Sequence, residues 1–429
     1  MNSTSCFVEA ILPKRCVPVQ STEVGITTEI YETISDIASS EWDHVVSRQN
    51  NLFLTHAYLS ALEESHRNIL RFRYLLFFFQ NKVVGAACFQ LFEVIAKEAL
   101  KNEPEPDLQI PSSFYKRMVG GLRKKIRDIS FRQISKLRLR VLVCGNALLT
   151  GEHGVFFSPQ ITSFQAGFLL SHAISRIEAE EKAAGRAINL TLIKDFPQNK
   201  AAEARKLLDF GYKEINFQPN MLMTLPEEWK SFDHYLLALS SKYRIRTKKV
   251  LSKGSKLEKK EFDLHDIREN LPEIYNFYLE VANSMDFNML SAQPGYFVEL
   301  KRQLEDRFVV NGYFLEGKLV GFICAFAANN HLEVHFTGYD HTINKEFAIY
   351  SNMLYDMVGL GLYRGVATLS FGRTALEIKS TVGAVGADMP AFIKYNNPCV
   401  HRFLIPLINQ FNNTGWIPRH PFKHPAMEQ

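Results

Sequence analysis

The sequence predicts an α/β (α+β) protein in which one unit occurs twice, each copy a mixed sheet covered by helices. At 429 residues the chain is too long for one ordinary hydrophobic core. A predicted hairpin at residues 72–92 matches a second one at residues 312–328, because Val84-Gly85 stands in the first where Val320-Gly321 stands in the second. Two predicted helices precede each hairpin, and this repeated order indicates an internal duplication.

The second copy shows the clearest pattern of elements. After its hairpin, a strand at residues 331–338 alternates apolar and polar side chains, so that Leu332, Val334 and Phe336 point to one face. His331, Glu333, His335 and Thr337 point to the other. A helix over about 345–362 has apolar residues at helical spacing, and a buried strand at 366–371 follows it. A last strand is expected at 389–395.

We expect a lead-in segment over residues 1–27, a first domain over 28–225 and a second domain over 226–429 that ends in a helix and a tail. The first domain begins with helices at 34–48 and 55–65, the second of them capped by Thr55. Residues 97–140 form an insertion that the second copy lacks. Its apolar residues from Phe114 to Ile129 lie beside a basic face, which predicts weak contact with an anionic membrane surface. A helix packed on its own domain has the same pattern.

Composition indicates a globular protein of a reducing compartment. Hydrophobic residues make up 46% of the chain, and no apolar run is long enough to cross a membrane. The six cysteines show no paired spacing, so we expect no metal site. The N-terminus shows no secretory signal, and we expect a cytoplasmic protein, with a position at the periphery of the inner membrane as an alternative. The net charge is only +5, yet residues 242–260 contain nine Lys or Arg and one acid.

Three segments resemble the FemAB-like branch of the GNAT acyltransferase superfamily, which includes peptidoglycan aminoacyl-ligases and acetyltransferases linked to cellulose and exopolysaccharide synthesis. They are the basic run at residues 239–249, Gly338-Tyr-Asp340 with the helix around Tyr350, and Phe371-Gly-Arg373 with Lys379 and Gly383. The resemblance covers roughly the C-terminal half. It implies tandem GNAT-like domains, of which the second is catalytic because the first lacks a comparable polar strand face.

The polar face of the strand at 331–338 is the candidate catalytic surface. Strands of a sheet covered on both sides by helices are expected to be almost wholly apolar, so this face needs water, polar partners or a ligand. Glu333 or His335 is the candidate general base toward an attacking amine. A solvated strand end would show the same pattern. The resemblance implies that Lys379 supports acyl transfer by stabilising charge on the carbonyl oxygen.

The candidate substrate-binding residues are cationic or aromatic. Lys242, Arg246 and Lys249 recur at helical spacing on one face, and such a row suits phosphate groups, although a basic run is often only a solvated helix face. The full set consists of Lys242, Arg244, Arg246, Lys249, Tyr350 and Arg373. We expect the basic row to share one cavity between the domains with His335 and Lys379.

The acyl donor stays open between acyl-CoA (acetyl-CoA) and aminoacyl-tRNA. Standard acetyl-CoA-binding units hold the pyrophosphate in a glycine-rich loop, whereas residues 339–345 are not glycine-rich. We expect transfer of an acetyl or aminoacyl group to an amine or hydroxyl of a small metabolite, or of an anionic, lipid-linked or polysaccharide precursor of the cell envelope. The alternative is a non-catalytic binding or scaffold protein of the same fold. The basic segments lack interleaved aromatic residues, so we expect no DNA binding.

Overall fold

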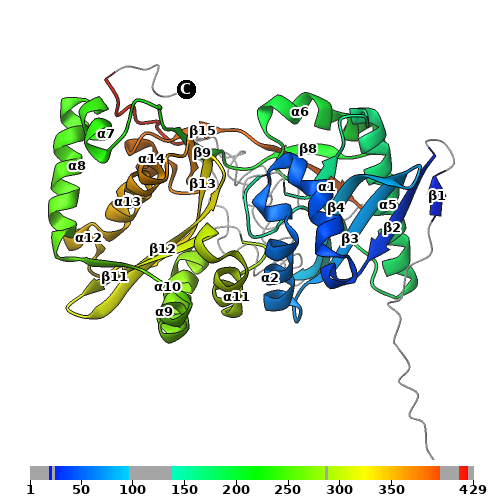
Figure 1. Cartoon of the computed structure of the whole chain (residues 1–429), viewed down its shortest axis with the longest axis horizontal. Helices are drawn as coiled ribbons and strands as arrows, with labels where there is room; N and C mark the ends of the chain where they lie inside the picture. Colours follow the sequence, from blue (N-terminus) through cyan, green and yellow to red (C-terminus); the bar gives the residue numbers. More distant parts are fainter. Residues whose placement is uncertain are drawn as a thin grey trace, which may run out of the picture.

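Two sheets, each covered by helices, lie side by side in the molecule (Figure 1). The computed structural model describes residues 19–21, 25–95, 138–151, 153–285, 288–396 and 415–423. Within these residues the first sheet has the strand order β1-β2-β3-β4-β5-β7-β16-β8, with β6 paired to β4. The second sheet has the order β10-β11-β12-β13-β14-β9-β15. The predicted insertion at 97–140 and the predicted C-terminal helix fall almost wholly outside the described residues.

The strands of the first sheet come from both ends of the chain. They are β1 (Val19–Ser21), β2 (Ile26–Tyr31), β3 (Arg71–Phe79), β4 (Lys82–Ile95), β5 (Arg138–Cys144), β6 (Val155–Phe157), β7 (Leu190–Ile193), β8 (Lys213–Asn216) and β16 (Pro390–Tyr395). The second sheet consists of β9 (Asn220–Thr224), β10 (Glu258–Glu261), β11 (Phe308–Leu315), β12 (Lys318–Ala328), β13 (His331–Tyr339), β14 (Thr368–Ser370) and β15 (Val385–Ala387).

The two sheets repeat one topology, as the sequence predicts. Each contains a single parallel pair at the same step, β5 with β7 and β13 with β14, and the other pairs are antiparallel. The matched Val-Gly dipeptides lie at equivalent β-bulges. The extra residue of the bulge is Val84 in the first hairpin and Val320 in the second. A β-bulge increases local twist, so both hairpins bend at the same point of the repeat.

Each sheet contains one strand from the other half of the chain. A division of the chain at residue 225, as predicted, therefore does not separate the two sheets. Strand β9, at the end of the first predicted domain, pairs with β14 and β15 of the second sheet. Strand β16, expected to close the second copy, pairs instead with β7 and β8 of the first sheet. Both strands are largely buried, and burial alone does not specify which sheet completes a strand's hydrogen bonds.

The helices of the first half cover both faces of its sheet. They are η1 (Ile34–Asp36), α1 (Ser39–Val46), η2 (Ser47–Gln49), η3 (Leu52–Leu54), α2 (His56–His66), α5 (Ser163–Ala183), α6 (Gln198–Ala204) and η4 (Arg205–Phe210). Helix α2 begins as predicted, because the Thr55 side chain accepts a hydrogen bond from the Tyr58 amide. The helix predicted over residues 34–48 is instead three short helices, since Ala38 adopts an extended conformation between η1 and α1.

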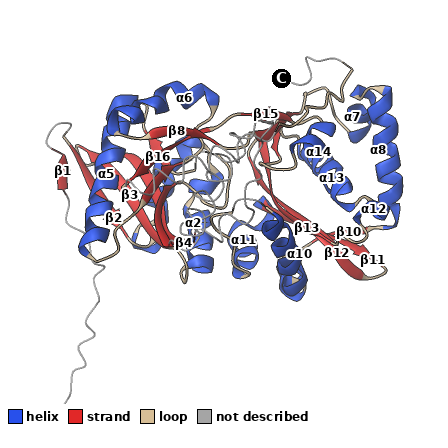
Figure 2. Ribbon diagram, turned by 180° about the vertical axis from the view of Figure 1, so that it is seen from behind, coloured by secondary structure: helices blue, strands red, loops and turns tan. Residues whose placement is uncertain are grey.

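The helices of the second half are α7 (Phe232–Ala238), α8 (Ser241–Lys253), η5 (Gly254–Lys256), α9 (Leu264–Glu269), α10 (Leu271–Ser284), α11 (Gly295–Leu304), η6 (Glu305–Arg307), α12 (Asn344–Phe347), α13 (Ile349–Arg364) and α14 (Leu376–Thr381). Helix α13 buries Met353 and Met357 against one face of the second sheet. Helices α10 and α11 pack on the other face, which is the face toward the first half (Figure 2).

The two halves share one hydrophobic core. Helix α2 of the first half lies against α11 of the second (Figure 1), and their buried side chains belong to a single cluster. The Tyr58 and Tyr296 hydroxyls are 2.9 Å apart, and Asn146 donates to the Tyr58 hydroxyl at 2.7 Å. The contact between Tyr58 and Tyr296 joins the two halves, and because both hydroxyls are buried it helps to fix how the halves meet.

Candidate active site

Strand β13 contains a bulge that changes which side chains share its faces. Ile323 pairs with Thr337, but Ala325 already pairs with Val334, so His335 and Phe336 together oppose Cys324. As a result Phe336 packs with Tyr278 of α10, and Thr337 contacts Met353 of α13. The predicted alternation is therefore correct up to His335 and wrong for Phe336 and Thr337, because a bulge adds one residue to the period of two.

Glu333 lies on the face of β13 that is directed toward the first half. Its carboxylate accepts a hydrogen bond from the Ser370 hydroxyl at 2.9 Å and lies 3.2 Å from His331 Nε2. The residue is only 7% exposed, and burial raises the pKa of the Glu333 carboxyl above its usual value, although His331 and Ser370 oppose this effect. No Lys or Arg forms an ion pair with Glu333 among the residues that the structure describes.

Glu333 also marks the point where two parallel strands separate. Strand β14 pairs with β13 only from His331 to Glu333 and ends at Ser370, whereas β13 continues to Tyr339. Ser370 is held in turn by Asn220 of the exchanged strand β9, at 3.1 Å. Three neighbouring strands therefore place polar side chains where the sheet opens.

Lys379 lies on the short helix α14, which follows the turn after β14. It is 5% exposed, and its Nζ donates to the carbonyls of Gly372 at 3.3 Å and Arg373 at 2.6 Å. Burial lowers the pKa of Lys379 to about 7, and the Glu333 carboxylate partly offsets this effect. Lys379 thus holds the turn after β14 as well as carrying charge toward Glu333.

Arg373 connects the turn to the first half. Its guanidinium forms two hydrogen bonds with the Asp195 carboxylate, at 2.8 and 3.1 Å, and its Nε donates to the Gln218 carbonyl. Asp195 is fully buried and has a φ of +59°, and Thr374 and Ala375 also have positive φ. Such conformations are costly for residues other than glycine and persist only where the surroundings fix them.

His335 is surrounded by aromatic rings. Its imidazole stacks on Phe336 with centroids 3.7 Å apart and lies 5.0 Å from the Phe326 ring. Burial lowers its pKa to about 3, and within the described residues its Nε2 has no hydrogen-bond partner. Phe326 is the cross-strand partner of Glu333, so the imidazole and the carboxylate are close along the same face of the sheet.

The other predicted binding residues lie elsewhere. Helix α8, with Lys242, Arg244, Arg246 and Lys249, runs along the edge of the second half that is farthest from the first half (Figures 1 and 2). Tyr350 lies in the first turn of α13, packs on the α13 side of the sheet and stacks with Tyr339. The structure therefore brings Glu333 and Lys379 together, with Arg373 adjoining, and separates them from the basic row.

Several polar residues of this region carry no sequence signal of their own. Ser370 and Asn220 look like ordinary strand residues until the exchanged strand places them beside Glu333. Asp195 follows a buried strand, and its ion pair with Arg373, which joins it to the turn after β14, has no counterpart in the local sequence. His331 was noted as polar, but its 2.7 Å contact with the Thr368 hydroxyl depends on the parallel pairing with β14.

Neither a metal-binding cluster nor a membrane-spanning helix is found among the residues that the structure describes. Within them, no group of three or more His, Cys, Asp or Glu side chains is arranged to hold a metal ion, and the expectation of a metal-free enzyme stays a prediction. None of the helices in the described ranges is sufficiently long and apolar to span a membrane.

Comparison with known proteins identifies the fold. No protein-family model matches the chain, and no curated protein matches it either. Among solved structures, the crystal structure of FemX matches with a TM-score of 0.51 at 13% identity, over 86% of this chain and 98% of FemX. The chain has the FemAB-like tandem GNAT fold. This agrees with the fold that the sequence predicts.

Two further structures are similar at lower scores. A tandem GNAT protein from the clavulanic acid biosynthesis pathway has a TM-score of 0.46 at 10% identity, over 86% of this chain and 99% of that protein. L-PGS from Bacillus licheniformis has a TM-score of 0.42 at 11% identity, over 83% of this chain and 96% of that protein.

The N-terminus of α13 does not fit the usual pyrophosphate cradle of an acetyl-CoA site. That cradle consists of free backbone amides at a helix N-terminus. Here the Tyr350 amide donates to the Asn344 side chain at 3.1 Å, and the Ala348 amide donates to the Asn344 carbonyl at 2.7 Å. The carboxylate of Asp340, in the loop before the helix, adds a negative charge.

Proposed function

We propose that this chain is an acyltransferase whose general base is Glu333. One observation carries the proposal: a buried carboxylate with raised pKa, which forms no ion pair with a Lys or Arg in the described part of the chain, stands where β13 and β14 separate. Burying a carboxylate in this way costs free energy, and such groups concentrate at functional sites. The FemAB-like fold, which acyltransferases share, supports the same reaction class.

The proposed reaction needs one proton acceptor and one charge-stabilising donor. The acceptor amine attacks the carbonyl carbon of the acyl donor, a C–N bond forms, and the amine passes a proton to the Glu333 carboxylate. The carbonyl oxygen gains negative charge, which Lys379 stabilises through its ammonium group. Collapse of this intermediate breaks the bond to the donor's leaving group, which departs with the electron pair. A hydroxyl acceptor follows the same scheme.

Glu333 suits the role of base better than His335. A general base works best when its pKa lies near the working pH. Burial raises the pKa of Glu333 toward that range and lowers the pKa of His335 to about 3, away from it. His335 is better explained as a neutral ring that packs beside the reacting groups.

The donor remains a choice between acyl-CoA and aminoacyl-tRNA. The Ala348 and Tyr350 amides at the start of α13 already donate to Asn344, and this does not favour CoA bound in the usual pyrophosphate cradle. We propose an amine or hydroxyl acceptor on a cell-envelope or polysaccharide precursor, the class that the resemblance of the C-terminal half to FemAB-like proteins implies.

The test compares Glu333→Gln with the unaltered protein. Both are incubated with radiolabelled acetyl-CoA or aminoacyl-tRNA and a panel of amino sugars and peptide amines, and transfer is counted. Glutamine preserves size and the hydrogen bond from Ser370 but cannot accept a proton, so the rate is expected to fall by roughly 10²- to 10⁴-fold. Full turnover by Glu333→Gln excludes Glu333 as the base. If the unaltered protein neither transfers nor binds either donor in calorimetry, the scaffold alternative replaces the enzyme.

A further inference from the structure

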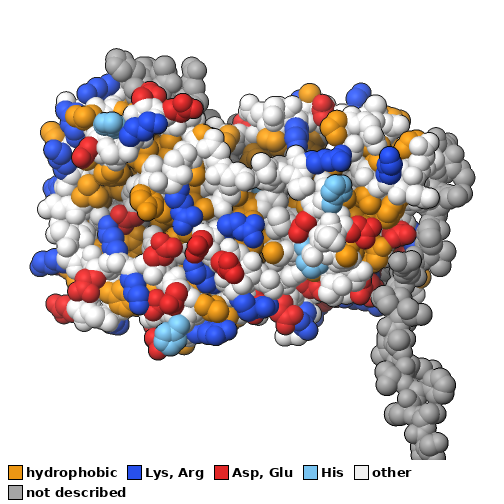
Figure 3. Space-filling view, viewed as in Figure 1, with side chains coloured by type: hydrophobic (Ala, Val, Ile, Leu, Met, Phe, Trp, Pro, Cys, Tyr) orange, Lys and Arg blue, Asp and Glu red, His pale blue; other side chains and the backbone are white. Residues whose placement is uncertain are grey.

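Helix α8 presents a row of cations that the rest of the described structure does not neutralise. Its thirteen residues include Lys242, Arg244, Arg246, Lys248, Lys249 and Lys253, and no acid. Lys242, Arg246, Lys248 and Lys249 are exposed and take part in no ion pair that the described residues form. Figure 3 shows blue side chains along the edge of the molecule that α8 forms.

This charge is unfavourable for the helix itself. Cations four residues apart, such as Lys242 with Arg246 and Lys249 with Lys253, repel each other. Lys242 also stands in the first turn, where the helix dipole disfavours positive charge. The inner face explains why α8 still folds: Thr247 donates to the Tyr355 hydroxyl at 2.9 Å, and Val250 accepts from Asn352 at 3.0 Å. The cations Lys242, Arg246 and Lys249 of the outer face form no comparable hydrogen bond within the described residues.

Apolar side chains interrupt the cationic face. Ile245 lies between Lys242 and Lys249 at helical spacing and is 70% exposed. Leu237, in the helix α7 that leads into α8, is 59% exposed. Single exposed aliphatic residues are common on protein surfaces, but aliphatic side chains set among a row of cations are the pattern of a helix that lies at a lipid interface.

We propose that the outer face of α8 is a docking surface for an anionic lipid membrane. Cations along the helix attract the negative headgroups, and Ile245 inserts at the boundary between headgroups and acyl chains. Because α8 lies on the side of the second half that faces away from the first (Figure 1), docking there leaves the region around Glu333 uncovered. This surface is independent of the proposed reaction.

The same helix lacks the features of a surface that binds single-stranded nucleic acid. Proteins that bind single strands combine cations with aromatic rings on which bases stack. The aromatic ring of α8, Tyr243, packs against the core of the second half, and Lys242 lies 5.8 Å above it. An aliphatic residue in the middle of the row matches a lipid interface better than a polynucleotide.

The test measures vesicle binding by the full-length chain. Vesicles of phosphatidylcholine with one third phosphatidylglycerol are sedimented with the unaltered protein and with the triple variant Lys242→Gln, Arg246→Gln, Lys249→Gln. Each cation near an anionic surface contributes about fivefold to partitioning, so the triple variant is expected to bind roughly a hundredfold more weakly. A control triple variant, Lys182→Gln, Lys206→Gln, Lys318→Gln, removes three exposed cations elsewhere and the same net charge, and is expected to stay within about threefold.

Two further measurements separate the contributions. Ile245→Ser is expected to weaken binding several-fold without changing its dependence on salt, because it removes apolar contact and no charge. Vesicles of phosphatidylcholine alone are expected to bind weakly. The proposal is overturned if the α8 triple variant binds as the unaltered protein does, if the control variant loses as much binding, or if the unaltered protein binds no anionic vesicle. Binding of a tRNA mixture that depends on α8, without vesicle binding, assigns the surface to nucleic acid instead.

Discussion

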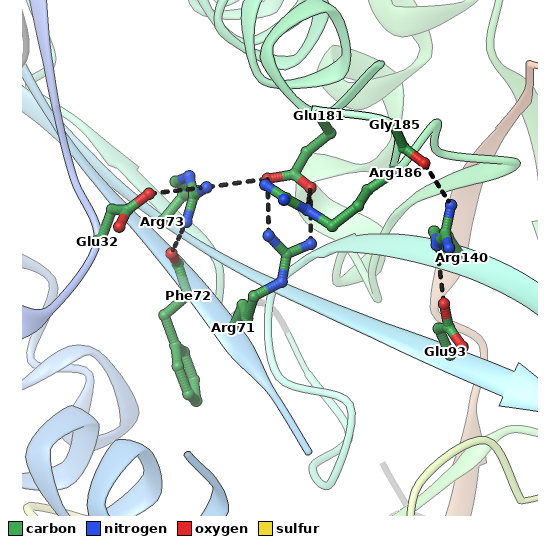
Figure 4. A network of polar contacts seen from close by, with 9 residues as sticks. All are labelled: Glu32, Arg71, Phe72, Arg73, Glu93, Arg140, Glu181, Gly185 and Arg186. Atoms are coloured by element: carbon green, nitrogen blue, oxygen red, sulfur yellow. Dashed lines mark hydrogen bonds and ion pairs between the residues drawn. The ribbon is translucent and has the colours of Figure 1, made fainter. Parts of the chain in front are cut away.

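Glu181 and Glu333 are both buried carboxylates, yet their surroundings are opposite. Glu181, on α5 of the first half, is 1% exposed and accepts hydrogen bonds from Arg71, Arg73 and Arg186 (Figure 4). Burial by itself would raise the pKa of Glu181, but the arginines lower it to about 2. Glu333 has a serine and a histidine as partners, and burial raises its pKa.

The difference shows that partners, rather than burial, decide what a buried carboxylate can do. Three guanidinium groups keep Glu181 ionised at any ordinary pH, so it cannot exchange a proton and serves to join β3 to α5. The Ser370 hydroxyl and the His331 imidazole stabilise the ionised Glu333 carboxylate less strongly than three guanidinium groups stabilise that of Glu181. A proton can therefore arrive at Glu333 during a reaction.

The largest expected effect is on stability, from Glu181→Gln. The substitution leaves three arginines around a neutral amide, and breaking a buried ion-pair network in this way costs about 3–5 kcal/mol of the free energy of unfolding. Urea denaturation measures the loss. Glu180→Gln on the same helix is the control, since the ion pair of Glu180 with Arg176 is partly exposed and worth about 0.5 kcal/mol.

The pH dependence of this stability has a definite sign. The pKa of Glu181 is lower in the folded chain than its usual 4.5, so its contribution is complete above about pH 5 and is lost as the pH falls toward 2. The difference between the unaltered protein and Glu181→Gln is thus expected to shrink across this window. A constant difference would mean that the glutamate is not the ionised centre of the network.

The next effect is on activity, from Lys379→Met. Removing a charge-stabilising donor typically slows acyl transfer by about 10²- to 10³-fold. The variant also removes the Lys379 donor from the Arg373 carbonyl, at about 1–3 kcal/mol of stability, whereas the Gly372 carbonyl still accepts from the Met221 amide. Lys194→Met serves as the control, because Lys194 is likewise buried and donates to two carbonyls, of Asn146 and Leu149; unlike Lys379 it also lies 3.5 Å from a carboxylate, that of Asp195. It is expected to lose stability and keep most of the activity. Equal loss of activity in both variants would reduce Lys379 to a structural residue.

The pH–rate profile of the unaltered protein tests the same pair of groups. Transfer needs Glu333 ionised and Lys379 protonated, so kcat/KM is expected to rise through the raised pKa of Glu333 and to fall through the pKa of Lys379, near 7. Since Lys379→Met removes the group that loses its proton, its residual rate should keep the acidic limb and lose the alkaline one. An alkaline limb that persists in Lys379→Met belongs to another group.

The sequence predicted the fold more fully than the site. Hairpins, helices and the repeated unit follow from local patterns, and the Val84-Gly85 and Val320-Gly321 pairs mark equivalent bulges in the two sheets. The partner of a strand is not a local property. The exchange of β9 and β16 therefore could not be read from the chain, and with it the placement of Asn220 beside Ser370 was missed.

Within the candidate site, the sequence singled out Glu333 and Lys379 as candidates but did not predict their surroundings. An alternating pattern cannot reveal the extra residue of a bulge, so Phe336 and Thr337 were assigned to the wrong faces of β13. The basic row of α8 is a helix face, as its spacing indicated, but spacing does not say which way a helix turns relative to a distant domain. Position relative to the other half comes from packing over the whole chain.

The smallest expected effect, from His335→Phe, decides between the two candidate bases. The His335 ring lies among Phe336, Phe326 and Tyr296, and its Nε2 is without a partner in the described residues. A buried polar atom without a hydrogen bond costs free energy, so a ring of similar size without that nitrogen is expected to leave stability unchanged or to raise it by about 1 kcal/mol. Thermal denaturation measures this, and the transfer rate is expected to change less than about threefold. If His335→Phe instead lowers the rate a hundredfold while the fold is intact, the imidazole takes part in proton transfer, and the contrast between Glu181 and Glu333 no longer identifies the base.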